Sequence, residues 1–406
     1  MGRRVSDSTT FQPTVGGQNG DGNSSSGATR TDHFRGGTAW GEGFMDEVRL
    51  LDLGLCSYTQ SQTLYHALAD SLRPDQPNTI ILCRPRRPYV CIGRHQELGR
   101  EVDTAACARL GLPILRREVG GGAVYLDRDQ LFFQMVWQPR DVPPRIAQAF
   151  EYFARGPVEC YRALGIPGAH FAPVNDLQVG GRKIGGLGAA TIGQAFVFVG
   201  SIISAFDADA AASVLLISDE KIRDKVASTM AAYVSSLERE LGRRPAPRVV
   251  RRELVTAFER TLGVSLIPGT LRGDERQAYS RRVRRMRSRA WLDDVRLPAD
   301  RLRALRITGN VRVGHAVRKA PGGLVRATLI IADGQITHAL LSGDFYAVGD
   351  VVPELEQALL GPVAESGPRD RLYRRWRADA IPGLAPGDVA EVVESALEPT
   401  ASEEPA

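Results

Sequence analysis

The stretch NDLQVGGRKIGGLG, residues 175–188, has the pattern of a β-hairpin, with a glycine pair between two strand-like runs. It also holds Lys183, and lysine is rare in this chain. Of the 52 basic residues only four are lysines, at positions 183, 221, 225 and 319. By this usage a merely solvated position would carry arginine, so Lys183 favours a ligand role over that of a surface hairpin residue. A compact ammonium with rotatable donors suits a carboxylate or a phosphate.

A second glycine-rich stretch, RREVGGGAVYLD at 116–127, places three consecutive glycines (120–122) between two predicted strands. Glycines let backbone N–H groups approach an anion such as phosphate closely. Arg116 and Arg117 stand just before them and could supply fixed positive charge. A plain hairpin turn explains the glycines equally well, so both interpretations stay open from the residues alone.

Short apolar runs and amphipathic runs alternate around these two stretches. Strands are expected at 79–85 and 89–94, as a pair formed by 113–119 and 130–137, in the hairpin at 175–186, and at 194–206. Helices are expected at 144–165, with Pro157 inside, and at 207–218 and 248–263. Because strands and helices do not follow a regular βαβ order, the sequence predicts an α+β fold with a mixed or antiparallel sheet.

Composition divides the chain into five expected parts. Residues 1–44 are rich in Gly, Ser and Asn, which predicts a disordered N-terminal extension, and Met45 could be the true start. A main domain is expected at 45–265, an Arg-rich connecting helix at 266–303, a small α+β domain at 304–398 and a disordered tail at 399–406. In the small domain, PGG and ADGQ separate three apolar runs, which predicts successive hairpin strands.

The Arg-rich segment carries most of the positive charge. Residues 272–303 hold eleven arginines and five acidic residues, a balance of +6, whereas the whole chain has a formal charge of +5. Tyr279, Val283, Met286 and Ala290 are spaced as one apolar helix face. The sequence favours a connecting helix with a solvated basic face, then docking of an acidic protein, and least of all nucleic acid.

Several classes of protein are disfavoured by composition. No run of 18 apolar residues occurs, so no membrane-spanning helix is expected. The five cysteines show neither a metal-binding nor a disulfide pattern, which favours a reducing, cytoplasmic location. The six histidines are too scattered for a metal site.

Four motifs and a tail domain resemble one known family. IGRHQEL, RREVGGGAVYLD, NDLQVGGRKIGG and SDEKIRDKVAS occur in the order and spacing of lipoate–protein ligase A and its relatives. GGLVRATLIIADGQI and SGDFYAV are similar to the C-terminal accessory domain of those ligases. The resemblance covers residues 45–398 and implies the catalytic fold shared by biotin–protein ligases, lipoate ligases and octanoyltransferases. It implies activation of lipoate by ATP to lipoyl-AMP, followed by transfer to a lysine of an acceptor domain in an E2 subunit or an H-protein-like partner.

The resemblance also assigns expected roles. Lys183 would be the catalytic residue, bridging the lipoate carboxylate and the α-phosphate, where a fixed ammonium stabilises developing charge. Asp176, with Asn175, would position Mg²⁺ or the ligand, since a hard cation favours carboxylate oxygen. Arg117 would contact a phosphate of the nucleotide. The expected ATP- and lipoate-binding set is Arg94, Arg117, Gly121, Gly122, Ala123, Val124, Tyr125, Asn175, Asp176, Lys183 and Gly186.

Departures from the family pattern leave alternatives open. Leu126 and the pair Val199–Gly200 stand where the family has histidine and His-Gly, and Gly185 replaces a small polar residue. An octanoyltransferase would hold the acyl group on a cysteine, but the stretch before Asn175, IPGAHFAPV, has none. Cys160, in a predicted helix, is interpreted as a buried structural thiol. A non-catalytic protein that binds acyl-carrier domains is the remaining alternative. The adenylate loop typical of biotin ligases is not found.

Overall fold

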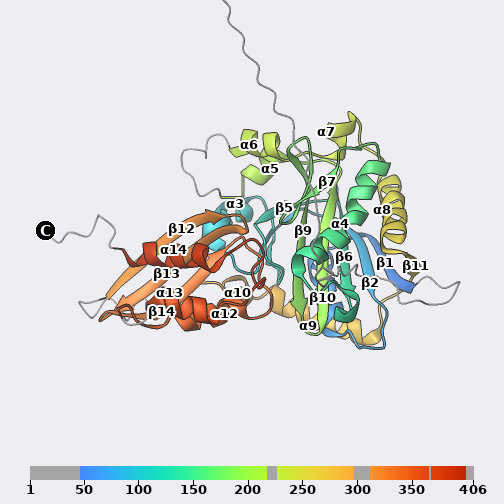
Figure 1. Cartoon of the computed structure of the whole chain (residues 1–406). Coiled ribbons are helices and arrows are strands. Elements are labelled where there is room, and N and C mark those ends of the chain that lie inside the picture. The colour runs from blue at the N-terminus through green and yellow to red at the C-terminus, as the bar shows by residue number, and fades with distance from the viewer. Residues whose placement is uncertain (1–45, 217–225, 297–310, 365–366, 399–406) are drawn as a thin grey trace, which may run out of the picture. The chain divides into compact units, whose positions relative to one another are not determined.

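The computed structural model describes residues 46–216, 226–296, 311–364 and 367–398 (Figure 1). The predicted N-terminal extension at 1–44 and the tail at 399–406 lie outside the described residues. So do most of the SDEKIRDKVAS motif and the end of the Arg-rich segment. The described residues contain two main β-sheets and one small one.

The largest sheet contains eight strands of the main domain. They are β1 (Asp46–Cys56), β2 (Thr79–Pro85), β6 (Gln130–Trp137), β7 (His170–Ala172), β8 (Asp176–Val179), β9 (Arg182–Ile192), β10 (Ala195–Ile203) and β11 (Val264–Pro268). Their order is β11–β1–β2–β6–β10–β9–β8–β7. β1 pairs in parallel with β2 and β11, and the other pairs are antiparallel. The mixed sheet confirms the predicted α+β class.

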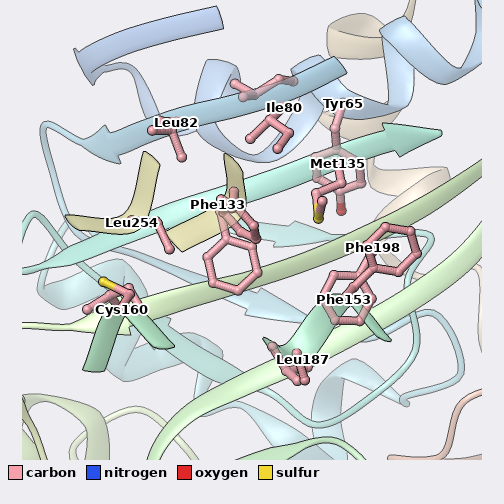
Figure 2. Packing of buried hydrophobic residues seen from close by; sticks show 14 of the residues in the cluster. Tyr65, Ile80, Leu82, Phe133, Met135, Phe153, Cys160, Leu187, Phe198 and Leu254 are labelled. Carbon is pink, nitrogen blue, oxygen red and sulfur yellow. The ribbon is translucent and has the colours of Figure 1, made fainter. Parts of the chain in front are cut away.

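Helices cover both faces of this sheet, and its central strand β6 is therefore buried on both sides. On one face lies α1 (Tyr58–Asp70), where Gln134 of β6 donates a hydrogen bond to the Ser61 carbonyl at 2.5 Å. On the other face lie α4 (Ile146–Ala163) and α8 (Pro247–Leu262), where Phe133 meets Phe258 edge to face. Figure 2 shows Phe133 and Phe153 within this apolar layer. Burial of such aromatic side chains is the main favourable term for the domain.

A three-stranded sheet holds the segment before the glycine run, and here the expected strand pairing is wrong. β3 (Tyr89–Ile92) lies between β4 (Ile114–Arg116), which it meets in parallel, and β5 (Val124–Leu126). The predicted partner of β4, β6, pairs instead with β2 and β10. All eight residues of β6 are buried, so it needs a neighbouring strand on each side within the large sheet. The glycine run therefore joins two strands of the small sheet and does not close a hairpin with β6.

The helix expectations are confirmed at 144–165 and 248–263, where α4 contains Pro157. The expected helix at 207–218 is wrong for residues 213–216, and its last two residues lie outside the described residues. α5 covers only Ala208–Ala212, and Val214 is then buried in the core that the small sheet makes. The other helices in the described part of the main domain are α2 (Leu98–Glu101), α3 (Thr104–Arg109), α6 (Val226–Tyr233), α7 (Leu237–Leu241) and a 3₁₀ turn at Pro139–Asp141.

Up to residue 296, the Arg-rich segment forms two helices where one was expected. α9 (Gly273–Met286) ends before Ser288, whose side chain caps α10 (Arg289–Leu292). Ala290 is exposed, so the predicted apolar face does not extend that far. Arg282 is largely buried and pairs with Asp70 and Glu118 at 2.5 Å each, so it is not part of a solvated basic face. The segment packs on α1 through ion pairs as well as apolar contacts.

A separate C-terminal sheet domain follows, as predicted. Its strands are β12 (Val311–Ala320), β13 (Gly323–Ala332), β14 (Gln335–Gly343) and β15 (Gly361–Pro362), antiparallel throughout. Its helices are α12 (Val351–Leu359), α13 (Pro368–Arg375) and α14 (Pro386–Leu397). The β12–β13–β14 meander confirms the hairpin strands expected from the glycine-containing turns. The domain has its own apolar core between the sheet and these helices.

Candidate functional site

A cavity of about 580 Å³ opens where the two glycine-rich stretches of the main domain meet the C-terminal domain. Its walls come from α1, the glycine run, β5, β6, β8–β10 and α6, and from the turn between β12 and β13. A volume of this size is in the range of small-molecule sites. The cavity is therefore the candidate site, and the following contacts describe its chemistry.

The β8–β9 hairpin places Lys183 at this cavity. Gly180 and Gly181 form its turn with φ of 53° and 75°, the left-handed region that glycine adopts without strain. A register shift between Leu177 and Gln178 leaves an extra residue in β9, a β-bulge of the kind that re-aims side chains beside active sites. The Lys183 carbonyl accepts a hydrogen bond from the Ser235 N–H at 2.8 Å. The lysine backbone is thus held by strand pairing and by the chain after α6.

The Lys183 ammonium pairs with Asp176 across the hairpin, with 2.7 Å between Nζ and Oδ1. The Tyr233 hydroxyl donates to the other carboxylate oxygen at 3.0 Å. A Cβ on Gly186 would lie 3.3 Å from Nζ, so glycine there leaves room for the ammonium. Because an ammonium has three donors, the pair with Asp176 leaves two for ligand oxygens.

The arginines before the glycine run have different surroundings. Arg117 lines the cavity, and its guanidinium donates to the carbonyls of Gly120 and Gly122 at 2.8 Å each. Arg116 is fully buried and donates to five carbonyls, which belong to Gly93, Arg94, Gln96, Trp291 and Leu292. Its charge is used to join α10 to the small sheet and does not reach the cavity wall.

The glycine run packs closely against the C-terminal domain. A Cβ on Gly120 would lie 2.5 Å from the Phe345 carbonyl oxygen. A Cβ on Gly121, whose φ is +87°, would lie 2.4 Å from the Tyr346 hydroxyl oxygen. The Gly121 N–H donates to the Phe345 carbonyl at 3.2 Å. Close packing against another domain thus explains these glycines, a third cause beside the two that the sequence left open.

Nine of the eleven expected binding residues line the cavity. They are Arg117, Gly122, Ala123, Val124, Tyr125, Asn175, Asp176, Lys183 and Gly186. Leu126, Val199 and Gly200, the departures from the family pattern, line it too. Gly121 lies beneath Tyr346, outside the lining. Arg94 is also not brought to the cavity, because it pairs with Asp294 at 2.5 Å and lies over the Trp291 ring.

Sequence reasoning missed the contribution of the C-terminal domain. Lys319, Asp344 and Tyr346 all line the cavity, and Lys319 lies 3.8 Å from Asp344. Both lysines within the described residues therefore line it, so the rarity of lysine pointed to Lys319 as strongly as to Lys183. No comparable signal marks Tyr346. The polar residues missed in the main domain are Gln62, Tyr65, Gln130, Gln134, Ser201 and Tyr233.

None of the five cysteines lines the cavity, and all are buried. Burial raises the pKa of the Cys160 thiol far above its usual value, which opposes thiolate formation. Within the described residues no three His, Cys, Asp or Glu side chains gather as a metal site. Nor does any helix there have the length and apolarity to cross a bilayer.

Comparison with known proteins identifies the relatives of this arrangement. The model of the lipoyl protein ligase A/B catalytic domain matches residues 57–259. An octanoyltransferase of Kyrpidia tusciae is 27% identical over 54% of this chain and 88% of its own length. Lipoate–protein ligase 1 of Staphylococcus aureus is 26% identical over 68% of this chain and 78% of its own.

Solved structures agree with this fold. A bipartite lipoate protein ligase of Thermoplasma acidophilum, from a lipoylation system that includes its E2 lipoyl domain, has a TM-score of 0.57 at 26% identity. It covers 62% of this chain and 99% of its own. A lipoate–protein ligase A bound with ATP has a TM-score of 0.53 at 23% identity, with 61% and 98% covered.

Proposed function

The chain belongs to the lipoyl protein ligase A/B catalytic domain family, and from this premise we propose that it is an ATP-dependent lipoate–protein ligase. Its relatives include both ligases and octanoyltransferases, so membership makes it an enzyme of lipoyl or octanoyl groups. The choice between the two rests on the site. The observation that carries the proposal is a cavity with a paired lysine and no cysteine on its wall.

In the first half-reaction, a lipoate carboxylate oxygen attacks the α-phosphorus of ATP. A new C–O–P anhydride bond forms, the bond to the β-phosphate oxygen breaks, and pyrophosphate leaves. Lys183 would hold the carboxylate and the α-phosphate with its two remaining donors while Asp176 holds the third. A fixed ammonium stabilises the charge that builds on the phosphate oxygens, and its pairing with Asp176 limits reorganisation during the step.

The wall of the cavity fits the nucleotide and a divalent cation. The segment from Gly122 to Tyr125 lines it and would contact the adenylate through backbone groups, and Arg117 supplies a positive charge beside the loop. Asn175 and Asp176 offer hard oxygens for Mg²⁺, which is commonly held by one or two protein oxygens with phosphate and water. When bound, the cation would neutralise phosphate charge.

In the second half-reaction, the amine of an acceptor lysine attacks the acyl carbonyl, an amide forms, and AMP leaves with the bonding electrons. The Thermoplasma ligase, whose system includes an E2 lipoyl domain, supports an acceptor domain of that kind as partner. The competing octanoyltransferase would hold the acyl group as a thioester. The buried cysteines and the raised pKa of Cys160 argue against such an intermediate.

Intact mass of an acceptor domain tests the proposal. The full chain is incubated with a lipoyl domain and lipoate, with and without MgATP, and in parallel with octanoyl-carrier protein without ATP. The expected result is addition of one lipoyl group in the presence of ATP only. Octanoyl transfer without ATP would replace the ligase by the transferase, and no modification in any arm would favour the non-catalytic alternative.

A further inference from the structure

Tyr346 of the C-terminal domain reaches into the main domain. Its side chain belongs to the apolar core of the large sheet, where its ring meets Phe150 edge to face. Only 7% of the residue is exposed. Gly121 makes room for it, since a Cβ at that position would lie 2.4 Å from its hydroxyl oxygen. Tyr346 is thus as much a part of the main-domain core as of its own domain.

The Tyr346 hydroxyl closes a three-membered hydrogen-bond ring at the cavity. It donates to the Leu187 carbonyl at 2.7 Å and accepts from Asn175 Nδ2 at 2.8 Å. Asn175 Nδ2 also donates to the Leu187 carbonyl at 3.2 Å. Burial raises the pKa of Tyr346 to about 12, so the hydroxyl keeps its proton at neutral pH and can donate.

This ring fixes which atom Asn175 presents to a ligand. A carbonyl oxygen only accepts, so the carboxamide nitrogen must face Leu187, and its second N–H goes to Tyr346. Both amide hydrogens are then used, which leaves the oxygen, Oδ1, for the cavity that Asn175 lines. Beside Asp176, such an oxygen suits a cation or a hydrogen-bond donor and would repel a bare phosphate oxygen.

We propose that Tyr346 is a positioning residue for nucleotide activation, holding the Asn175 carboxamide with its oxygen toward the cavity. The role in activation rests on the proposed function, whereas the hold on Asn175 does not. Without the hydroxyl, one amide hydrogen loses its partner and the carboxamide can rotate. The C-terminal domain thereby completes a site whose other polar groups come mainly from the main domain.

A double-mutant cycle tests the proposal in the full chain. Lipoate-dependent adenylate formation is measured against MgATP and against lipoate for Tyr346→Phe, Asn175→Ala and the double variant. Of the two hydrogen bonds that Tyr346→Phe removes, the one from Asn175 holds the carboxamide, and its loss predicts a KM for MgATP raised about threefold to tenfold, with the KM for lipoate unchanged. In the Asn175→Ala background, Tyr346→Phe should add nothing, because Tyr346 acts through Asn175. The positioning role would be overturned if the two substitutions raised the KM for MgATP additively, or if Tyr346→Phe raised the KM for MgATP and the KM for lipoate equally.

A second measurement is independent of activity. The chain has five asparagines, at 19, 23, 78, 175 and 310, so ¹⁵N labelling of asparagine gives few carboxamide signals in an NMR spectrum. The Asn175 pair is assigned by its loss in Asn175→Ala. The two carboxamide N–H signals of Asn175 should shift in Tyr346→Phe. They should stay unchanged in Tyr373→Phe, a control at an exposed tyrosine of the same domain. An unshifted pair would overturn the contact.

The two readouts separate this inference from the proposed function. A wild-type chain that forms no adenylate would overturn the ligase assignment, and the role in activation with it. The carboxamide signal would still show whether Tyr346 holds Asn175. Thermal unfolding of each variant completes the set, since Tyr346→Phe keeps the buried ring and should unfold near the wild-type temperature. A collapse in stability together with equal loss for both substrates would instead assign a structural role.

Discussion

The two glycine-rich stretches of the main domain look alike in sequence and differ in what surrounds them. In the β8–β9 hairpin, a Cβ on Gly181 would have nothing within 4 Å, so that glycine serves only the positive φ of the turn. In the other stretch, Cβ atoms added at Gly120 and Gly121 would clash with Phe345 and Tyr346. Both stretches bring a charged side chain to the cavity, Lys183 in one and Arg117 in the other, but only the glycines at 120 and 121 lie directly against atoms of the C-terminal domain.

This difference teaches that a glycine run does not by itself identify a phosphate loop. Anion approach, turn geometry and domain packing all demand the absence of Cβ. Only the atoms facing the missing Cβ separate them, and these come from residues more than 200 positions away. For Lys183 the composition of the chain supplied a signal that glycine counts did not.

The largest effect is expected at the hairpin stretch, for Lys183→Arg. A planar guanidinium keeps the charge but not the compact donor geometry beside Gly186 and Asp176. Adenylate formation should fall at least about a hundredfold, the size of effect seen when one oxyanion-stabilising donor is removed. Arg182→Lys is the matched control, because Arg182 pairs with Glu240 at 2.8 Å and does not line the cavity. Near-normal activity of Lys183→Arg would show that the lysine of the hairpin stretch has no catalytic role that arginine cannot fill.

The next effect compares two glycines with positive φ, one in each stretch. Gly121→Ala should destabilise the chain by about 3 kcal/mol or more, because backbone strain adds to a clash with Tyr346. Gly181→Ala should cost only about 1–2 kcal/mol, the strain alone. Urea unfolding of both variants measures the difference. Equal losses in the free energy of unfolding would mean that Gly121 is needed only for its turn and not for packing against the C-terminal domain.

A smaller effect is expected for the Arg-rich helices, which belong to neither stretch. Arg281, Arg284 and Arg287 are exposed, whereas Arg285 approaches Glu118 at 3.4 Å and lies over Trp291. Changing the three exposed arginines to Gln should slow transfer to an acidic acceptor about threefold to tenfold at low salt and flatten its salt dependence. Adenylate formation without acceptor should stay normal. If both half-reactions are unchanged, α9 is a connector; a loss in both makes it structural.

No effect on acyl transfer is expected for Cys160→Ser. The thiol is buried against the Val250 carbonyl and lies apart from the cavity lining. A modest loss of stability is the only consequence expected from the added hydroxyl. Mass spectrometry for an acyl thioester on any cysteine during turnover is the direct check. A trapped thioester would support the octanoyltransferase in place of the ligase.

Local sequence patterns predicted many of the elements, and nine of the eleven residues proposed for the site line the cavity, but these patterns did not predict long-range pairing. Local patterns gave the β8–β9 hairpin, α4, α8 and the C-terminal meander. They failed where partners are distant, as for β4, whose neighbour is β3 and not β6. They also failed at Arg116, whose five carbonyl partners no local pattern reveals. Local patterns did not predict a role for Tyr346 for the same reason, since its partners Asn175 and Leu187 lie in another domain.

Pyrophosphate release from ATP in the absence of acceptor tests the central claim most directly, which is that this cavity activates a carboxylate with ATP. The wild-type chain should release pyrophosphate only when lipoate is present, and Lys183→Arg should lose at least about 99% of that rate. Pyrophosphate release that does not depend on lipoate would contradict the account. So would the lack of any pyrophosphate release while octanoyl groups are transferred from a carrier to the acceptor.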